Sequence, residues 1–172
     1  MSVDERMEKL GEVLGKEGES QTLLDNFYAK VEQSKQKLQK AGILDKTVTI
    51  MEGVKGAMGV MTSKGYGRGS QVIYEYLGMK APRLYSGKLK NLRTMRPARK
   101  FPSRCCLSMP VMFRSAYEGM EDLSDNVIWN SIPAVKEGQL IEISFGLFFY
   151  NDIYSLDKQL DFVVDSLLET VK

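Results

Sequence analysis

Residues 47–78 read TVTIMEGVKGAMGVMTSKGYGRGSQVIYEYLG and predict two strands, a glycine-rich loop and a helix in immediate succession. The β-branched run at 47–51 and a weaker apolar run at 57–61 favour strands. Apolar residues then recur at helical spacing over 71–77, and Gly78 ends the pattern. Strands that alternate with helices are typical of α/β layer architectures. The sequence therefore predicts an α/β fold.

The flanking segments fit this architecture. Helical periodicity predicts a short helix before Gly15 and a long helix over 19–40, which at about 1.5 Å per residue would measure roughly 33 Å. Residues 140–144 alternate like a strand. An aromatic-rich loop is expected over 145–154, and Ser155 is expected to cap a final amphipathic helix.

The composition excludes several classes of protein. The chain has 172 residues, 43% of them hydrophobic and 27% charged, as in one globular domain. It has no histidine, which excludes Ser-His-Asp and Cys-His catalysis and histidine-ligated metal. It also has no run of about 18 apolar residues that could cross a membrane. The first ten residues are charged and lack an apolar core, so no signal peptide is expected.

One stretch carries much of the basic charge. Residues 86–104, SGKLKNLRTMRPARKFPSR, hold seven Lys or Arg and no acid, which leaves 17 basic against 22 acidic residues elsewhere. Cys105 and Cys106 follow directly, and two adjacent thiols form neither a relaxed disulfide nor a metal site by themselves. One hypothesis is a small basic protein that binds nucleic acid through 88–104. Against it, only Phe101 is available there to stack on bases.

The glycine-rich loop, Gly65-Tyr66-Gly67-Arg68-Gly69-Ser70, is the first candidate site. Its glycines let the backbone approach a ligand closely. It is not a phosphate loop, because no Lys-Ser/Thr pair follows and the spacing differs from the dinucleotide fingerprint. Arg68 can donate a forked pair of hydrogen bonds to an oxygen-rich ligand, and Tyr66 can stack or donate. The alternatives are an ordinary turn with a solvated arginine, or an enzyme whose base would come from scattered Glu and Asp.

The second candidate site is a run of aromatic residues near the C-terminus. Phe145, Phe148, Phe149, Tyr150 and Tyr154 fall within one predicted loop. Aromatic side chains near the end of a strand suit the wall of a ligand site. The alternative is that they pack under the last helix, and we expect this for Phe145 and Phe148.

Several of these segments together resemble one protein family. The most specific are GYGRGSQVIYEYLGMKAP at 65–82 and VIWNSIPAVKEGQLIEIS at 127–144, and the segments at 4–21, 45–52 and 148–167 also match. They resemble the C-terminal lobe of the iron–siderophore substrate-binding proteins of bacterial ABC importers, in the hydroxamate or ferrichrome-type branch. The resemblance covers most of the chain outside about 85–112.

The resemblance implies a specific α/β architecture. The chain would be a single three-layer lobe of a class III, helical-backbone periplasmic-binding-protein fold, preceded by the long interlobe helix. Residues 1–44 would be the helical lead-in and connector, and 45–172 the C-terminal ligand-binding lobe. The first lobe and the lipoprotein signal would be missing.

The resemblance also implies a binding module, not an enzyme. It would capture a ferric hydroxamate siderophore and deliver it to an ABC transporter permease. Tyr66, Arg68, Phe149 and Tyr150 match the family's ligand-binding positions, with Arg68 on the hydroxamate oxygens. The siderophore alone would coordinate the ferric iron, so no covalent cofactor and no protein metal ligand are expected. The expected partners are the siderophore, the permease and the missing N-terminal lobe, with no nucleic acid. The family lies outside the cytoplasmic membrane, anchored by lipid.

Residues 85–112 depart from the family pattern. Read in a frame offset by two bases, ARKFPSRCCLSMPVM at 98–112 can encode EKISLEVLPQYAGD, which is close to the family's segment. The hypothesis is that this aberrant basic segment is translated out of frame and that the true frame returns near Phe113. We therefore expect 86–112 to be irregular and not to fill the core.

Overall fold

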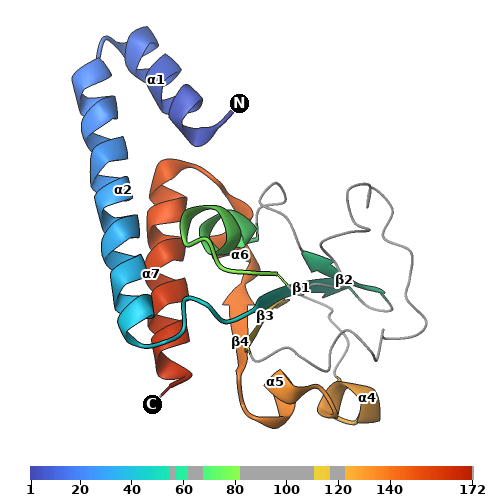
Figure 1. Cartoon of the computed structure of the whole chain (residues 1–172). Helices are drawn as coiled ribbons and strands as arrows, with labels where there is room; N and C mark the ends of the chain where they lie inside the picture. The colour runs from blue at the N-terminus through green and yellow to red at the C-terminus, as the bar shows by residue number, and fades with distance from the viewer. Residues whose placement is uncertain (55–56, 62–67, 82–110, 117–122, 172) are drawn as a thin grey trace.

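Five segments of the chain carry the described structure. The computed structural model describes residues 1–54, 57–61, 68–81, 111–116 and 123–171. Within them, a small sheet lies beside two long helices, and two short helices lie at the other side of the sheet (Figure 1).

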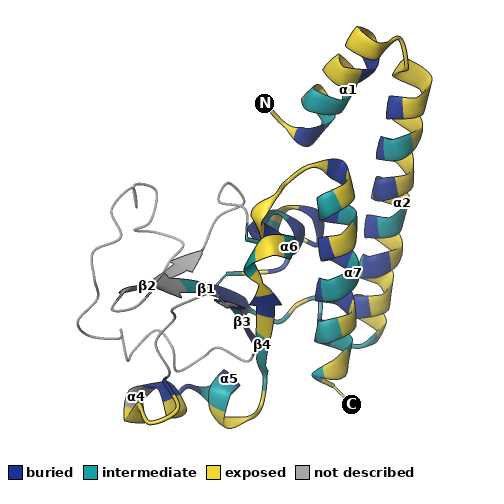
Figure 2. Cartoon of the chain, turned by 180° about the vertical axis from the view of Figure 1, so that it is seen from behind, coloured by how far each residue is buried: buried dark blue, intermediate teal, exposed yellow. Residues whose placement is uncertain are grey.

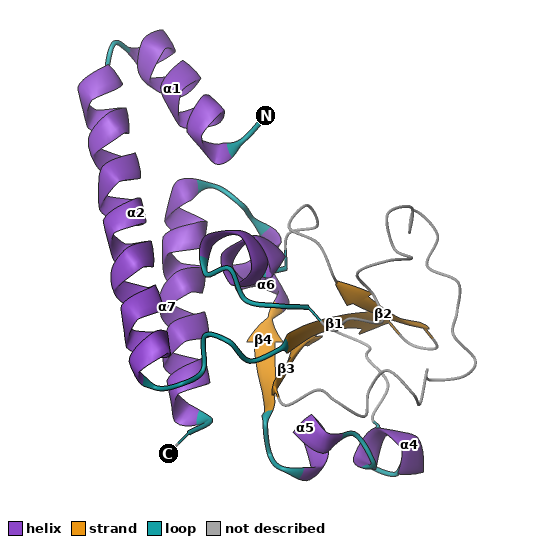
Figure 3. Ribbon diagram, in the orientation of Figure 1, coloured by secondary structure: helices purple, strands orange, loops and turns teal. Residues whose placement is uncertain are grey.

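Two helices open the chain. α1 (Val3–Leu14) begins with a capping box, in which the Ser2 hydroxyl accepts from the N–H of Glu5 at 3.1 Å and the Glu5 carboxylate accepts from the N–H of Ser2 at 2.7 Å. It ends at Gly15, whose φ of 64° lies in the left-handed region. α2 (Glu17–Lys40) follows at once and lies alongside the C-terminal helix (Figure 3). Both predicted helices are confirmed.

The sheet has four strands in the order β2-β1-β3-β4. β1 (Val48–Val54) and β2 (Ala57–Met61) form an antiparallel hairpin. β3 (Val111–Ala116) and β4 (Leu140–Ser144) extend the sheet from the other side of β1, and all three run parallel. The three strands that the sequence predicts are confirmed, and β3 is an additional strand.

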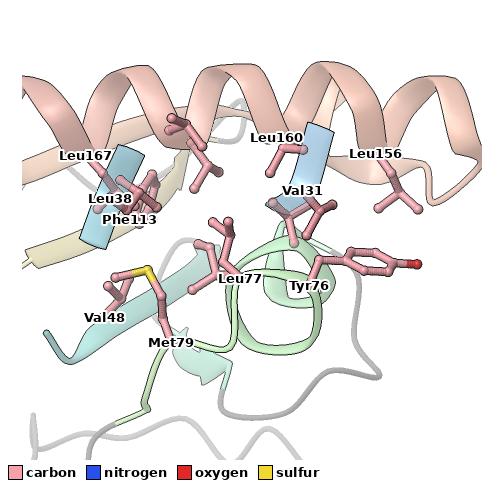
Figure 4. Packing of buried hydrophobic residues seen from close by; sticks show 14 of the residues in the cluster. Val31, Leu38, Val48, Tyr76, Leu77, Met79, Phe113, Leu156, Leu160 and Leu167 are labelled. Carbon is pink, nitrogen blue, oxygen red and sulfur yellow. The ribbon is translucent and has the colours of Figure 1, made fainter. Parts of the chain in front are cut away.

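The larger core lies on one face of the sheet. Ile50 of β1 and Phe113 of β3 are fully buried there. The same cluster includes residues of α2, the C-terminal helix α7 (Ile153–Glu169) and a π-helical turn, η1 (Gln71–Tyr76). Figure 4 shows part of this cluster, with Phe113 and Leu38 of α2 labelled. The dark stripes of buried residues on α2 and α7 face each other and the sheet (Figure 2). Across that helix pair, Lys30 forms ion pairs of 2.8 Å with both Asp157 and Asp161.

A smaller core lies on the opposite face. Met51 and Met112 pack with Trp129 and with α4 (Val127–Asn130) and α5 (Pro133–Lys136). Successive side chains of a strand point to opposite faces, so the alternate residues of β1 and β3 supply both cores. The predicted α/β fold, a single three-layer lobe, is confirmed.

The aromatic segment differs from the predicted loop. Its first five residues form a short helix, α6 (Phe145–Phe149), directly after β4. Asp152, not Ser155, caps α7. The Asp152 carboxylate accepts from the N–H groups of Tyr154 and Ser155 at 3.1 and 3.0 Å and from the Ser155 hydroxyl at 2.6 Å. The helix begins earlier than predicted because this carboxylate satisfies donors of the first turn that a serine three residues later could not reach.

The boundary predicted for the aberrant segment is also wrong. Val111 and Met112 are buried residues of β3, and they pair with Val48 and Thr49 of β1. The last two positions of the segment therefore fill the two cores in the middle of the sheet. Residues 82–110, which include 88–104 and both cysteines, lie outside the described residues, and the frame hypothesis stays a prediction for them.

The cap of α7 gives a test of local stability. Asp152→Ala is expected to lower the free energy of unfolding by about 1 kcal/mol, because it removes the acceptor of the first turn. Burial alone would raise the pKa of the Asp152 carboxyl, but hydrogen bonds from the Ser155 side chain and the backbone outweigh it and lower that pKa. The contribution is therefore present above the ordinary aspartate pKa of about 4 and is lost as the pH falls through the lower folded value.

Chemical denaturation at neutral and acid pH checks this prediction. Asp165→Ala is the control, because Asp165 is exposed on the same helix and its loss changes the charge equally. An Asp152→Ala effect no larger than the control, or one that persists unchanged in acid, would contradict the role of the cap.

Candidate ligand-binding site

The candidate site lies where the parallel strands end. Glu52 lies near the carboxyl end of β1, and β4 leads at its carboxyl end directly into α6. Arg68 precedes η1 and is hydrogen-bonded to both places. In open α/β sheets, ligands bind outside the carboxyl ends of the strands. The fold therefore brings these residues to the edge of the sheet where a ligand is expected.

The backbone of Arg68 is held against α6. Its N–H donates to the carbonyl of Phe148 at 3.0 Å, and its φ of 55° is left-handed. Gly69 follows with a φ of 78°, and a Cβ built on it would lie 2.7 Å from the Phe148 ring. Only glycine combines this conformation with so close an approach. This explains why the loop needs glycine immediately after the arginine.

The side chain of Arg68 is held by a carboxylate and two rings. Its Nε donates to Glu52 Oε1 at 2.7 Å, and the side chains of Arg68 and Glu52 are only 18% and 14% exposed. The guanidinium carbon lies 4.3 Å from the ring centroid of Phe145 and 4.9 Å from that of Phe149. These are cation–π distances. Within the described residues, the terminal amino groups of Arg68 make no hydrogen bond, so they can donate to a ligand.

The aromatic wall continues outward from the arginine. The rings of Phe149 and Tyr150 meet edge to face with centroids 5.1 Å apart. Phe149 is 48% and Tyr150 62% exposed. We call Glu52, Arg68, Phe145, Phe149 and Tyr150 the Arg68 cluster. It combines hydrogen-bond donors with exposed aromatic surface, which is the composition of a site for an oxygen-rich, partly apolar ligand.

The structure brings together three of the four predicted site residues. Arg68, Phe149 and Tyr150 lie side by side, and Tyr66 lies outside the described residues. Phe148 is buried and meets Phe162 of α7 with centroids 5.6 Å apart, as expected. Phe145 was expected to pack under the last helix, whereas the structure places its ring against the Arg68 guanidinium.

The sequence does not reveal Glu52 as a member of the cluster. In the sequence it follows the β-branched run at 47–51, with nothing to distinguish it from other acids. Only the tertiary structure shows that Arg68 lies beside it.

Among the described residues, no group of three or more Cys, Asp or Glu is placed to hold a metal ion. Within the same residues, no helix is long and apolar enough to span a bilayer.

An arginine and exposed aromatic rings thus lie at the carboxyl edge of the sheet, the edge at which open α/β sheets bind ligands. No family model matches the chain. The chain is 27% identical to the iron(3+)-hydroxamate-binding protein YxeB of Bacillus subtilis, over 98% of this chain and 54% of that protein. The chain thus spans about half the length of the curated relative it matches.

Solved structures agree with this relationship. A periplasmic binding protein component of a Fep/Fec-like ferrichrome ABC transporter from Bacillus subtilis superposes with a TM-score of 0.83 at 26% identity, over 98% of this chain and 62% of that protein. FhuD2 from Staphylococcus aureus with bound ferrioxamine B superposes with a TM-score of 0.81 at 21% identity, over 100% of this chain and 66% of that protein. The resemblance to iron–hydroxamate-binding proteins and the fold it implied are therefore confirmed.

The close approach of Gly69 to Phe148 gives a test of how the site is built. Gly69→Ala is expected to cost about 1–2 kcal/mol for the left-handed backbone and about 1–3 kcal/mol more for the clash with the ring. Gly78→Ala is the matched control, because Gly78 has a similar φ of 72° and open space around its Cβ position. Thermal denaturation of both variants measures the difference, and equal losses of stability would contradict the close approach.

Proposed function

We propose that the chain binds a ferric hydroxamate siderophore as one lobe of the substrate-binding protein of an ABC importer. The observation that carries this proposal is the Arg68 cluster, in which the guanidinium of an arginine lies against an exposed aromatic wall. The relatives support it, since they are iron–hydroxamate-binding proteins and a component of a ferrichrome transporter.

Each part of the cluster has a chemical role in this proposal. The terminal amino groups of Arg68 donate to the hydroxamate oxygens around the iron. The rings of Phe149 and Tyr150 cover the apolar backbone of the siderophore, and Tyr66, which lies outside the described residues, is proposed as a further contact with the ligand. The siderophore alone coordinates the ferric iron, so the protein supplies no metal ligand and holds no covalent cofactor. No bond is made or broken, and the chain acts as a binding module and not as an enzyme.

A second lobe completes the site in this proposal. The relative YxeB is nearly twice as long as this chain. In addition, α1 exposes apolar side chains that another domain can cover. Leu10, Val13 and Leu14 are 51%, 82% and 59% exposed. In this proposal residues 1–44 lead in and connect to the N-terminal lobe, and 45–172 form the C-terminal lobe. The assembled protein docks on a permease outside the cytoplasmic membrane, anchored by lipid, and nucleic acid is not a partner.

Equilibrium dialysis against ferrichrome tests the proposal. One lobe holds only part of the contacts, so we expect weak binding, with a dissociation constant well above micromolar. Arg68→Ala and Phe149→Ala are expected to weaken it about tenfold or more, because each removes a contact of the ligand surface. Dialysis is preferable to tryptophan emission, since Trp129 is buried in the smaller core against Arg114, on the other face of the sheet.

Tyr154→Ala is the matched aromatic control. Tyr154 is 68% exposed at the start of α7, and its loss should leave binding unchanged. Submicromolar binding by the chain alone would refute the role of a second lobe, and binding that Arg68→Ala leaves intact would refute the site.

A further inference from the structure

The Arg68–Glu52 ion pair is the most buried charge pair recorded in the described part of the chain. The Nε of Arg68 lies 2.7 Å from Glu52 Oε1, and each side chain is less than one-fifth exposed. Other ion pairs there include at least one side chain that is about one-third exposed or more. Both members of the pair belong to the Arg68 cluster.

The ion pair changes the net charge that a ligand meets at Arg68. A guanidinium alone attracts anions at long range, whereas a guanidinium with a carboxylate at 2.7 Å carries no net charge. Its remaining neighbours in the cluster, Phe145 and Phe149, are uncharged. Because little water reaches the pair, both charges are poorly screened, and repulsion of a negative ligand by the carboxylate offsets its attraction by the guanidinium. The amino groups still donate hydrogen bonds, but without a net positive charge behind them.

Ferric chelates differ in their net charge. Three hydroxamates each carry one negative charge and cancel the charge of a ferric ion, which gives a neutral complex. Three catecholates each carry two negative charges and leave a strongly anionic complex. Both kinds present oxygen atoms that accept hydrogen bonds, so hydrogen bonding alone does not separate them.

We propose that Glu52 is a positioning residue that sets the charge selectivity of the Arg68 cluster. It holds the guanidinium through Nε, which orients the terminal amino groups, and it cancels the positive charge, so that the cluster accepts chelates without net negative charge and rejects anionic ones. The choice of chelates as ligands rests on the proposed function, whereas the rejection of anions is a property of the pair itself.

The first experiment measures that property without a siderophore. The ¹⁵N–¹H signal of the Arg68 Nε group, identified by its loss in Arg68→Lys, is followed while inorganic sulfate is added. In Glu52→Gln, which keeps the shape of the side chain and removes its charge, sulfate is expected to shift this signal at concentrations about tenfold lower than in the wild-type chain. Glu142→Gln is the matched control, because Glu142 is also a strand residue paired with an arginine, Arg114, at 3.8 Å.

The second experiment measures selectivity between chelates. Dialysis compares ferrichrome, which is neutral, with ferric enterobactin, an anionic tricatecholate. The preference for ferrichrome is expected to fall about tenfold in Glu52→Gln and to remain in Glu52→Asp, which keeps the charge. A purely structural role of Glu52 would weaken both ligands alike and leave their ratio unchanged.

The outcomes separate this proposal from the proposed function. An equal response to sulfate in the wild-type chain and Glu52→Gln, or an unchanged ratio of the two chelates, overturns the role of Glu52. If the wild-type chain binds neither chelate, the proposed function of this chain fails, and the sulfate titration still decides the role of Glu52. If Glu52→Gln does not fold, the wild-type chain alone still tests the proposal. Tighter binding of sulfate than of ferrichrome at Arg68 would contradict it.

Discussion

Both faces of the central strands β1 and β3 are buried, and this constraint organises the rest of the lobe. Ile50 and Phe113 point into the core beneath α2 and α7, while Met51 and Met112 point into the core beneath α4 and α5. A shift of one residue in the register would exchange the two sets of side chains, so the pairing of β1 with β3 is strongly specified. Helices on both faces then leave the strand ends as the place where polar side chains can gather.

The Arg68 cluster follows from this arrangement. Parallel strands end at one edge, so the end of β1 supplies Glu52 and the exit of β4 supplies α6 with its rings. The left-handed backbone at Arg68 and Gly69 lets the loop touch Phe148, which joins η1 to α6. The rigid core thereby fixes the position of a surface that a ligand can use, with the guanidinium held from behind and the outer rings exposed.

The proposed function and the role of Glu52 depend on different properties of the same cluster. In the proposed function, donor groups and aromatic surface bind an oxygen-rich chelate, and in the further inference the buried carboxylate sets which charge the chelate carries. The first proposal is supported by the likeness to an iron(3+)-hydroxamate-binding protein. The second rests on a 2.7 Å ion pair with little access to solvent. Because the chain covers about half of its matched relative, the cluster represents one side of a two-sided site in this proposal.

Local patterns in the sequence were sufficient for α1, α2, η1 and α7 and for three of the four strands, because periodicity and turn chemistry are carried by neighbouring positions. The family motifs also named Arg68, Phe149 and Tyr150, which the structure brings together. They were insufficient for β3, whose first residues follow a basic, proline-containing segment. Tertiary structure alone decided that Glu52 pairs with Arg68, that Phe145 lies on the guanidinium, and that Asp152 caps α7. The first two of these contacts join residues 16 and 77 positions apart, and their distances depend on the register of the sheet and the path of the loop, which no local pattern encodes.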